Sequence, residues 1–296
     1  MKVMLAANYS GTENLKEFVV SYKLDGIRCL VNENEALTRS GKVIRNRKLK
    51  LALIEAGRYV KRHIPEIDWL DGELVYQDQD SGTWGKTSSI VMSFDKEYTG
   101  IEYHIFDYIP AHGHRHKLFL DRLEVLKKIS IDFYFLGMVV KVVDRFNITD
   151  HQDLHNAMDI AVATGYEGLM LNRLYAYYKH GRATPLSQEL VKLKKWDHAE
   201  SKVIAVDELM HNIGEPERGR DGIVRRSKVA ENLVGTDVLG ALVLDNGLKV
   251  GTGFTDKQRR YYWTEECPIG KVCRYKYLPS VGDAPRHPVF ISLGDK

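Results

Sequence analysis

Cysteines are scarce in this sequence and long apolar runs are absent, and each shortage excludes a class of protein. The three cysteines, Cys29, Cys267 and Cys273, are odd in number and lack C-x-x-C spacing, which disfavours a disulfide framework or a zinc site and favours reduced thiols. No stretch approaches the roughly 18 uninterrupted apolar residues of a membrane span, and the N-terminus lacks the apolar run of a signal peptide. We therefore expect a soluble cytoplasmic protein with no membrane partner.

A large excess of one charge is also missing, because 43 basic and 40 acidic residues leave a net charge of +3 over 296 residues. So small an excess neither requires nor excludes a polyanionic partner. The composition, 44% hydrophobic and 28% charged, is close to the globular average and argues against a disordered or collagen-like chain. A nucleic-acid surface, if the protein has one, must therefore be a local basic patch.

Short runs typical of β-strands alternate with helical spacing in the first two thirds of the chain. β-branched and aromatic residues predict strands at 17–23, 27–33, 69–76, 101–109, 139–145 and 166–172. Helical patterns cover 47–64, 117–130 and 150–165, and the third begins after a capping residue, Asp150, and ends at Gly165. The apolar faces expected for the first two helices are Leu49, Leu53, Ile54 and Tyr59, and Leu118, Leu123 and Leu126. This mixture predicts an α+β domain of antiparallel sheets with flanking helices.

The pattern changes after Trp196, where short strands follow one another at turn-rich spacing. Apolar runs occupy 201–210, 238–247, 248–253, 271–278 and 287–293, and the triplet Asp245–Gly247 (DNG) predicts a hairpin turn. About 100 residues of such strands favour a small β-barrel of the OB-fold type. We therefore expect one domain over residues 1–197 and an OB-fold domain over 198–296.

The segment Lys23–Arg28 (KLDGIR) begins at the end of an apolar strand and contains an Asp-Gly turn. Only a free amine can attack an electrophile, and partial burial near positive charges would lower the pKa of Lys23 and make it a usable nucleophile. Arg28 could hold an anion, because its planar fork matches phosphate oxygens. An exposed lysine beside a turn is the alternative, since so short a motif also occurs by chance.

Two acid–glycine motifs follow on separate predicted strands. Alternation puts Asp71 and Glu73 on one face of their strand, and Gly72 between them lets another group approach closely. Glu167 precedes a second glycine in the run E-G-L-M. Separated carboxylates suit Mg²⁺, or Mn²⁺ in its place, because such ions prefer oxygen ligands and keep waters and substrate phosphates. Glu73 and Glu167 are therefore the candidate metal ligands.

Lys192 and Lys194 lie on one face of the strand predicted over 190–194 (LVKLK). Two like charges side by side repel each other unless an anion lies between them, so a phosphate partner would explain the pair. A solvated strand face is the alternative.

Taken in this order, the motifs resemble those of the covalent nucleotidyltransferase superfamily, which comprises ATP-dependent DNA ligases, RNA ligases and mRNA capping enzymes. The resemblance spans nearly the whole chain, and its V-G-T-G-F stretch is similar to that of DNA ligase OB domains. The matching segments are Met4–Ala6, Lys23–Arg28, Thr38–Gly41, Asp71–Leu74, His104–Tyr108, Glu167–Gly168, Tyr178–Arg182, Lys192–Lys194, Val250–Phe254, Arg286–Phe290 and Asp295–Lys296.

The resemblance implies a role for each motif residue. Lys23 attacks the α-phosphate of ATP, releases pyrophosphate and becomes a lysyl-AMP, while Phe106 stacks on adenine unless it is a core aromatic. Arg28 and Arg39 meet the ribose or a 5′-phosphate. The remaining implied contacts are the ribose or metal for Glu73, the divalent ion for Glu167, the α-phosphate for Lys192 and Lys194, and the pyrophosphate for Arg286, Asp295 and Lys296.

Three departures from the family pattern matter. Ser21 stands where the family commonly has a longer polar side chain that reads the adenine amino group, so adenine selection would rest more on backbone groups. The last motif has Val289, Ser292 and Gly294 where further arginines are usual. No additional DNA-binding domain is seen, which is the pattern of a minimal ligase of the phage or viral kind, acting as a monomer on nicked duplex DNA.

DNA contacts are expected from local basic groups. The segment 211–228 is polar, contains glycine and has the composition of a loop, which either folds over DNA as a clamp or stays a solvated surface loop. Further local candidates are Arg115, His116, Lys48 and Lys50. The residues expected at DNA are Arg39, Lys179, Arg182, Arg218, Arg220, Arg225 and Arg226.

The leading hypothesis is an ATP-dependent DNA ligase that seals 5′-phosphate/3′-hydroxyl nicks through lysyl-AMP on Lys23 and an adenylated DNA 5′ end. An RNA ligase and a GTP-using mRNA capping guanylyltransferase are the enzyme alternatives, against which the V-G-T-G-F and L-V-K-L-K runs argue. An inactive nucleic-acid-binding module of the same fold is the remaining alternative. The intact set of Lys23, Glu73, Glu167, Lys192 and Lys194 argues against such a module.

Overall fold

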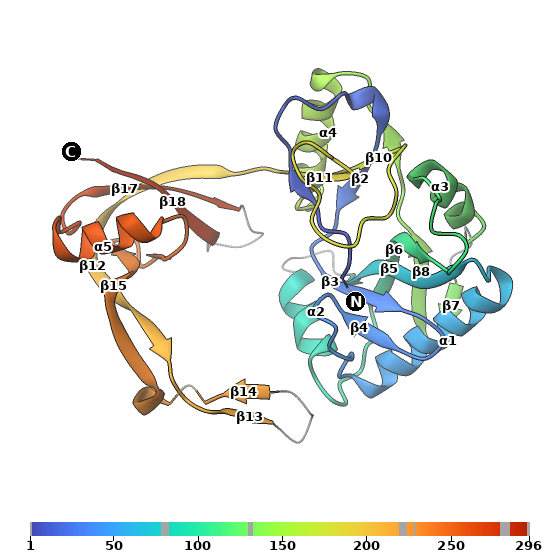
Figure 1. The fold of residues 1–296 in the computed structure, drawn as a ribbon, viewed down its shortest axis with the longest axis horizontal. Helices are drawn as coiled ribbons and strands as arrows, with labels where there is room; N and C mark the ends of the chain where they lie inside the picture. Colours follow the sequence, from blue (N-terminus) through green and yellow to red (C-terminus); the bar gives the residue numbers. More distant parts are fainter. Residues whose placement is uncertain are drawn as a thin grey trace. The chain divides into compact units, whose positions relative to one another are not determined.

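The computed structural model describes residues 2–77, 83–129, 133–218, 224–227, 229–278 and 285–294. The chain divides into two compact units, Met1–Lys195 and Trp196–Lys296. Figure 1 shows two sheets with helices beside them in the first unit, and a further sheet with the helix α5 in the second. The predicted α+β class is confirmed.

The larger sheet of the first unit has six strands in the order β4–β3–β5–β6–β8–β7. Neighbouring strands in this sheet pair antiparallel, except that β6 and β8 pair parallel. The two ten-residue strands β5 and β6 form its centre, and Leu70, Leu74, Tyr103 and Ile105 on them are almost fully buried. The strands are β3 (Ile27–Val31), β4 (Ala36–Thr38), β5 (Ile67–Tyr76), β6 (Ile101–Pro110), β7 (Phe133–Phe135) and β8 (Met138–Val142).

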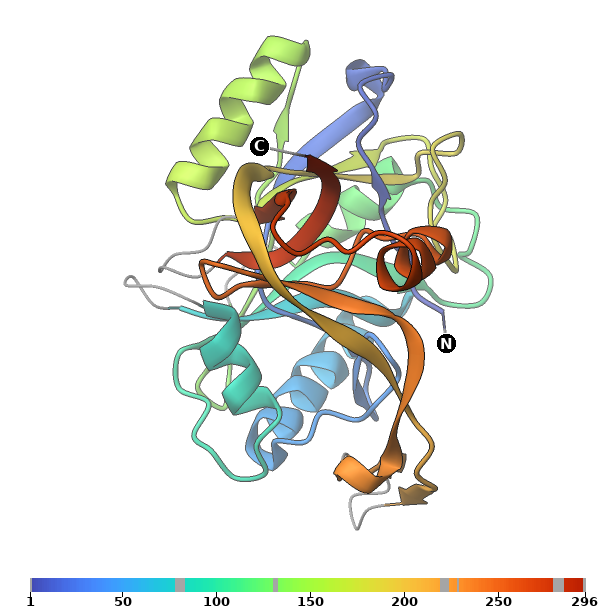
Figure 2. The same ribbon diagram turned by 90° about the vertical axis from the view of Figure 1, so that its left-hand side faces the viewer.

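The smaller sheet of the first unit has five strands in the order β1–β11–β10–β2–β9. All pairs are antiparallel except β1 with β11. Its apolar face packs on α4, with Val20, Leu169, Leu171 and Val191 in the core between them. Figure 2 shows the ribbon of α4, in yellow-green, beside this sheet. The strands are β1 (Ala7–Asn8), β2 (Phe18–Lys23), β9 (Phe146–Asn147), β10 (Gly168–Arg173) and β11 (Leu190–Lys194), and a short 3-10 turn, η1 (Leu15–Glu17), precedes β2.

Helix α1 (Arg47–His63) forms where the sequence predicts it. The buried side chain of Asn46 caps it by accepting a hydrogen bond from the Leu49 N–H at 3.0 Å. Leu49 and Leu53 of the predicted face are fully buried, and the face continues through Ala56. Lysine, arginine and histidine fill the last turn, where positive charge complements the helix dipole.

Helix α3 (Phe119–Lys127) buries only part of the face predicted on Leu118, Leu123 and Leu126, because Leu126 is fully buried whereas the other two leucines are not. Leu118 and Leu123 are only half-buried, whereas Phe119 and Arg122 are almost fully buried. The buried Arg122 is compensated electrostatically, because a buried carboxylate on the adjacent strand β6, Asp107, binds its guanidinium. Apolar periodicity alone could not indicate this.

Helix α4 (His151–Ala163) begins as predicted, with the Asp150 carboxylate accepting from the Asp153 N–H at 2.9 Å, and Gly165 with φ +84° follows its end. Helix α2 (Thr83–Val91) was not predicted, since its sequence has a glycine and few strong helix formers. It is held to β5 by the buried Thr87, whose hydroxyl accepts from the Tyr76 N–H at 2.9 Å. None of the described helices is long and apolar enough to cross a membrane.

The second unit contains a five-stranded sheet in the order β16–β15–β12–β17–β18, with each neighbouring pair antiparallel. A bridge between Thr252, just after β16, and Val289 of β18 connects the two edges of the sheet, as in the partly open barrel of an OB-fold. The predicted turn at Asp245–Gly247 joins β15 to β16. The elements are β12 (Asp197–Asn212), η2 (Ala230–Asn232), β15 (Leu233–Leu244), β16 (Lys249–Val250), α5 (Asp256–Thr264), β17 (Val272–Leu278) and β18 (Arg286–Gly294).

The segment 211–228 is not simply the loop that its composition suggests. Its strands β13 (Pro216–Arg218) and β14 (Val224–Arg226) pair antiparallel as a two-stranded sheet. In Figure 1 this sheet lies beyond the end of the long strands β12 and β15. The prediction missed it because neither strand shows apolar alternation, so backbone pairing rather than burial forms it. Arg220 and Lys228 lie outside the described residues.

Candidate active site

Three adjacent strands, β2, β10 and β11, place the charged residues of the site in one cross-strand row. Lys23 pairs with Gly168 in the ladder of β2 and β10, and Gly168 pairs with Lys194 of β11. Directly paired residues of antiparallel strands point to the same face. Because the central residue has no side chain, no side chain of the row itself separates Lys23 from Lys194.

Gly168 is required at the centre of this row. Its φ is +147°, and a Cβ added to it would lie 2.2 Å from the carbonyl oxygen of Leu193. Any other residue would therefore strain β10 and push β11 away. The glycine of the E-G motif thus explains how two lysines from separate strands come together.

Glu167, directly before this glycine, places its carboxylate between the two lysines. It forms ion pairs with the Nζ atoms of Lys23 and Lys194, and its backbone N–H donates to the Lys23 carbonyl at 3.0 Å. Burial raises the pKa of Glu167, but the neighbouring charges and hydrogen bonds of Lys23 and Lys194 outweigh it and lower the pKa. The carboxylate is therefore charged at neutral pH and holds both lysine side chains.

The next rows along the same strands become less polar. Ser21 pairs with Met170, which pairs with Lys192, and beyond them Asn172 pairs with Leu190. The side chains of Ser21 and Asn172 are buried, at 4% and 5% exposure. Neither makes a side-chain hydrogen bond to another residue that the structure describes. The floor of the site thus runs from lysines at one end to apolar and small polar groups at the other.

The pKa of Lys192 is lowered by burial and by neighbouring positive charges. Burial lowers its pKa most, and Lys194, Arg182 and Lys23 lower it further, while Glu167 opposes them. A group in this state gains when an anion enters the site, because a nearby negative charge favours the protonated amine.

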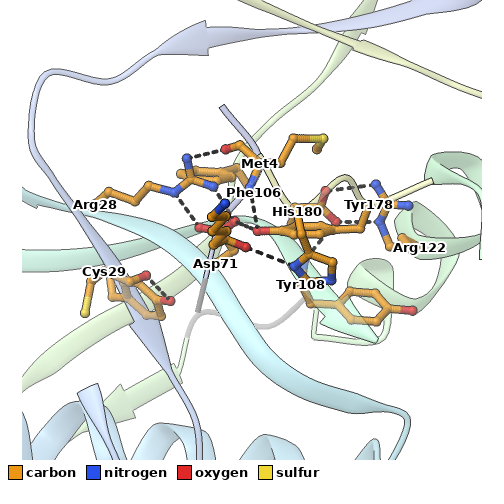
Figure 3. Close-up of polar contacts among 12 residues, drawn as sticks. Met4, Arg28, Cys29, Asp71, Phe106, Tyr108, Arg122, Tyr178 and His180 are labelled. Atoms are coloured by element: carbon orange, nitrogen blue, oxygen red, sulfur yellow. Dashed lines mark hydrogen bonds and ion pairs between the residues drawn. The ribbon is translucent and has the colours of Figure 1, made fainter. Parts of the chain in front are cut away.

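Strands β3, β5 and β6 form the opposite wall, which Figure 3 shows in close-up. The guanidinium of Arg28 binds the Asp71 carboxylate through Nε (2.8 Å) and Nη2 (2.5 Å), and Nη1 donates to the Met4 carbonyl at 2.7 Å. Its Cζ lies 5.2 Å from the centre of the Phe106 ring. Three of the five N–H donors of an arginine are thus engaged within the protein.

Glu73 lies opposite Arg28 in the ladder of β3 and β5. Burial raises the pKa of Glu73 to about 7, although Lys23 and Arg28 oppose the shift. The carboxyl group is therefore poised between its two protonation states near neutral pH, and an added cation would favour the charged form.

The two walls enclose a cavity of about 250 Å³. The predicted residues Lys23, Arg28, Glu73, Phe106, Lys192 and Lys194 line it together. Phe106 therefore faces the cavity, whereas Glu167 is not among the lining residues and reaches the site through its ion pairs with Lys23 and Lys194. The cavity is also lined by Leu5, Ala6, Ser21, Arg39, Met170, Asn172, Arg182 and Leu190, together with Tyr22, Leu24 and Val143.

The basic residues predicted at DNA are dispersed. Arg39 and Arg182 lie at the cavity, and Arg182 donates to the Ala6 carbonyl at 2.9 Å. Lys179 instead forms an ion pair with Glu189 at 2.8 Å, away from the cavity. Among the further candidates, Lys48 pairs with Glu97.

Other predicted residues lie in the second unit. Arg218 ends β13, Arg225 lies on β14, and Arg226 ends β14, where its side chain is exposed. Arg286 is the first residue of β18. The predicted contacts of Arg220, Asp295 and Lys296 fall outside the described residues.

Several residues of the site were missed from the sequence. Asn172 follows Met170 by two positions, so the alternation that placed the lysines on one face would have found it too. Tyr178 was part of a matching segment but received no role, yet its hydroxyl donates to Asp71 at 2.6 Å. Arg145 donates to the Phe106 carbonyl, and no local pattern signals this contact.

The described carboxylates of the site do not by themselves form a complete set of metal ligands. Among the described residues, no group of three or more histidine, cysteine, aspartate or glutamate side chains converges as a metal site. The charge of Lys23 lowers the pKa of both Glu73 and Glu167, so both acids lie in its vicinity. Two carboxylates suit an ion such as Mg²⁺, which takes its other ligands from water and substrate phosphates.

Comparisons with known proteins agree on one family. A family model described as ATP dependent DNA ligase domain matches residues 3–194. The DNA ligase of Haemophilus influenzae is 25% identical over 279 residues, which cover 93% of this chain and 85% of that protein. A solved Lig E DNA ligase, studied for DNA binding with a minimal scaffold, is 25% identical with a TM-score of 0.71, and 99% of each chain is covered. The DNA ligase-adenylate of Chlorella virus is 26% identical with a TM-score of 0.54, again over 99% of each chain. The family model covers well over half of the chain, which therefore belongs to the ATP-dependent DNA ligases.

Proposed function

We propose that Lys23 is the residue that carries AMP in this ligase. Its Nζ, once deprotonated, attacks the α-phosphorus of ATP, so that a P–N bond forms while the bond to the α,β-bridging oxygen breaks and pyrophosphate leaves. The observation that carries this proposal is the row in which Lys23 and Lys194 face each other across Gly168 at the polar end of the cavity.

The polarity of the cavity floor suggests how the nucleotide is oriented. Phosphates belong at the end with Lys23, Lys192 and Lys194, because unlike charges attract and the lysines otherwise repel one another. The base belongs at the other end of this floor, and Phe106, which also lines the cavity, would offer it a ring face. There Ser21 and Asn172 would offer hydrogen bonds to the edge of adenine, in place of the longer side chain that Ser21 replaces.

Lys192 and Lys194 would stabilise the transition state. Negative charge grows on the α-phosphate oxygens as the phosphorus becomes pentacoordinate, and positioned cations favour that state over the ground state. Burial lowers the pKa of Lys192 most, and the charges of Lys194, Arg182 and Lys23 lower it further, so an incoming anion would favour the protonated form of this lysine.

The two acids fit a divalent cation. Glu167 is charged. Burial raises the pKa of Glu73, and a nearby cation would offset this effect by favouring the charged carboxylate. Mg²⁺, or Mn²⁺ in its place, would be held by these carboxylates together with substrate phosphates and would neutralise part of the triphosphate charge. Glu167 also holds Lys23 in place through their ion pair.

The later steps concern nicked duplex DNA. AMP moves from Lys23 to the 5′-phosphate at the nick, forming a pyrophosphate linkage, and the 3′-hydroxyl then attacks that phosphate and releases AMP. Arg39 and Arg182 are suited to hold the 5′-phosphate because they lie at the cavity. The hairpin residues Arg218 and Arg226 would bind the duplex as a clamp.

The wider setting follows from the substrates. ATP and DNA occur together inside cells, so we infer a cytoplasmic site of action, and the free thiols of Cys29, Cys267 and Cys273 suit that compartment.

We assign residues 1–197 to a nucleotidyltransferase domain and 198–296 to an OB-fold domain that supplies Arg286 to the pyrophosphate. Because one chain carries both domains, a monomer would be sufficient to seal a nick.

Protein labelling tests the first step. With α-labelled ATP and Mg²⁺, the wild-type protein should acquire an acid-labile label, and Lys23→Ala should abolish it. Lys16→Ala, which removes an exposed lysine just before the same strand, is the matched control and should label normally. Label on Lys23→Ala, or a preference for GTP, would contradict the proposal.

Sealing assays test the substrate. The protein should join a nick in duplex DNA faster than a nick in RNA, and its rate should fall steeply as salt rises, because phosphate contacts release counterions. Arg218→Gln combined with Arg226→Gln should weaken DNA binding without changing adenylation of Lys23. Preferential sealing of RNA would overturn the choice of DNA.

A further inference from the structure

Four residues at the wall of the cavity form a closed network of hydrogen bonds, drawn in Figure 3. Arg28 donates twice to Asp71, and the Tyr178 hydroxyl donates to the same carboxylate at 2.6 Å. The Met4 N–H donates back to the Tyr178 oxygen at 3.3 Å, and the Met4 carbonyl accepts from Arg28 at 2.7 Å. We call Arg28, Asp71, Tyr178 and Met4 the four-residue network.

The four-residue network is buried, so each of its hydrogen bonds matters. Asp71 is fully buried and Tyr178 is 8% exposed. A buried carboxylate needs its donors, and removing one leaves part of its charge uncompensated. The hydroxyl of Tyr178 is thus the third donor that completes the shell of Asp71.

The four-residue network joins the two walls of the nucleotide cavity. Arg28 and Asp71 belong to the six-stranded sheet, whereas Tyr178 lies in the connection between β10 and β11. Met4 begins the segment that continues through Leu5 and Ala6, which line the cavity. One hydroxyl therefore links the arginine of one wall to the backbone of the other.

The aromatic ring of Tyr178 is itself held in place. Arg122 lies with its Cζ 5.7 Å from the ring centre, and it is fixed by two hydrogen bonds to Asp107 of 2.8 and 3.0 Å. Arg122 also donates to the Ala176 carbonyl, two residues before the tyrosine. The hydroxyl can therefore act as a fixed point for Asp71 and Met4.

We propose that Tyr178 is a positioning residue for the nucleotide site, whose hydroxyl acts through Asp71 and Met4 to fix Arg28 and the Leu5–Ala6 wall. The proposal rests on the proposed adenylation of Lys23 in this cavity. Tyr178 does not touch the reacting atoms, and its effect is to keep the two walls at the spacing that the nucleotide requires.

Tyr178→Phe tests this role, because it keeps the ring that packs on Arg122 and removes only the hydroxyl. Asp71 then loses one donor and the Met4 N–H loses its acceptor, so Arg28 and the Leu5–Ala6 wall are less well fixed. We expect the ATP concentration for half-maximal adenylation to rise about tenfold, which corresponds to about 1.4 kcal/mol. A merely structural role would lower the fraction of active protein without moving this concentration.

Two neighbouring tyrosines serve as matched controls. The buried hydroxyl of Tyr103 donates to the Cys29 carbonyl at 3.0 Å, so Tyr103→Phe removes a comparable hydrogen bond outside the network. The buried hydroxyl of Tyr108 has no hydrogen-bond partner among the described residues, so Tyr108→Phe removes none. Both variants should keep the half-saturating ATP concentration of the wild type, whatever their melting temperatures.

A double-mutant cycle with Asp71→Asn sharpens the test. If Tyr178 acts through Asp71, the combined variant should require little more ATP than Asp71→Asn alone. An unchanged half-saturating concentration in Tyr178→Phe, or an equal shift in Tyr103→Phe, would overturn the inference even if Asp71→Asn does not fold. Failure of the wild-type protein to label would instead refute the proposed function, so the two failures are distinguishable.

Discussion

The change Gly168→Ala tests whether the charged row of the site depends on the close approach of β10 and β11. Alanine would have to adopt φ +147°, a region that costs a residue with a Cβ about 1–3 kcal/mol. Its Cβ would also lie 2.2 Å from the Leu193 carbonyl oxygen and 3.2 Å from that carbonyl carbon. Relieving this contact displaces β11 and weakens at least one ladder hydrogen bond, for about 1 kcal/mol more. The total loss should be about 2–4 kcal/mol.

Gly165→Ala is the matched control for backbone strain. Gly165 has φ +84°, and an added Cβ would meet nothing within 4 Å, so alanine there should cost only about 1–2 kcal/mol. Denaturant unfolding measures both losses, and labelling with ATP measures the site. Only Gly168→Ala should also slow adenylation, because Lys23 and Lys194 flank that glycine. Equal losses of stability in the two variants, or normal adenylation by Gly168→Ala, would refute the reasoning.

Two further predictions concern stability. Burial raises the pKa of Glu102, but hydrogen bonds from His104 and Lys141 outweigh it and lower the pKa to about 2, from an ordinary 4.5. Glu102 therefore stabilises the fold fully above pH 4.5, by up to about 3 kcal/mol, and loses this contribution as the pH falls toward 2. Glu102→Gln should flatten the acid unfolding titration over that range, and an unchanged slope would contradict the assignment. Arg122→Leu leaves the buried Asp107 without its partner and should cost about 3–5 kcal/mol in unfolding experiments. The double change Arg122→Leu/Asp107→Leu should recover part of that loss, and no recovery would show that the ion pair is not its source.

The residues of the cavity could be predicted because their motifs are local. Alternation along one strand places Lys192 and Lys194 on the same face, and it places Asp71 and Glu73 on the same face, without any knowledge of the neighbouring strands. The resemblance to a known family then supplied the roles. What the sequence does not specify is that the strand of Gly168 lies between the other two strands of the row, because strand order depends on contacts far apart in the chain.

The predictions that failed depended on such distant contacts. The burial of Arg122 requires Asp107, which lies on another element, so apolar periodicity found Leu126 on the buried face of α3 but missed Arg122. The role of Tyr178 requires a carboxylate that precedes it by 107 residues. A tyrosine in a polar segment carries no local sign of such a partner, and only the folded chain reveals it.

The glycines of the three acid and lysine motifs meet one physical requirement. A Cβ at Gly26 would lie 2.1 Å from the Leu74 carbonyl oxygen, one at Gly72 would lie 2.5 Å from the His104 carbonyl oxygen, and Gly168 is equally restricted. In each motif a charged side chain is therefore accompanied by a residue that lets a neighbouring backbone come close. Charged groups from separate strands can converge only if these backbones pack tightly, because each side chain has a fixed reach. The motifs therefore contain both the charged groups of the site and the glycines that let their strands pack closely, which is why a glycine change should impair the site even though it removes no charge.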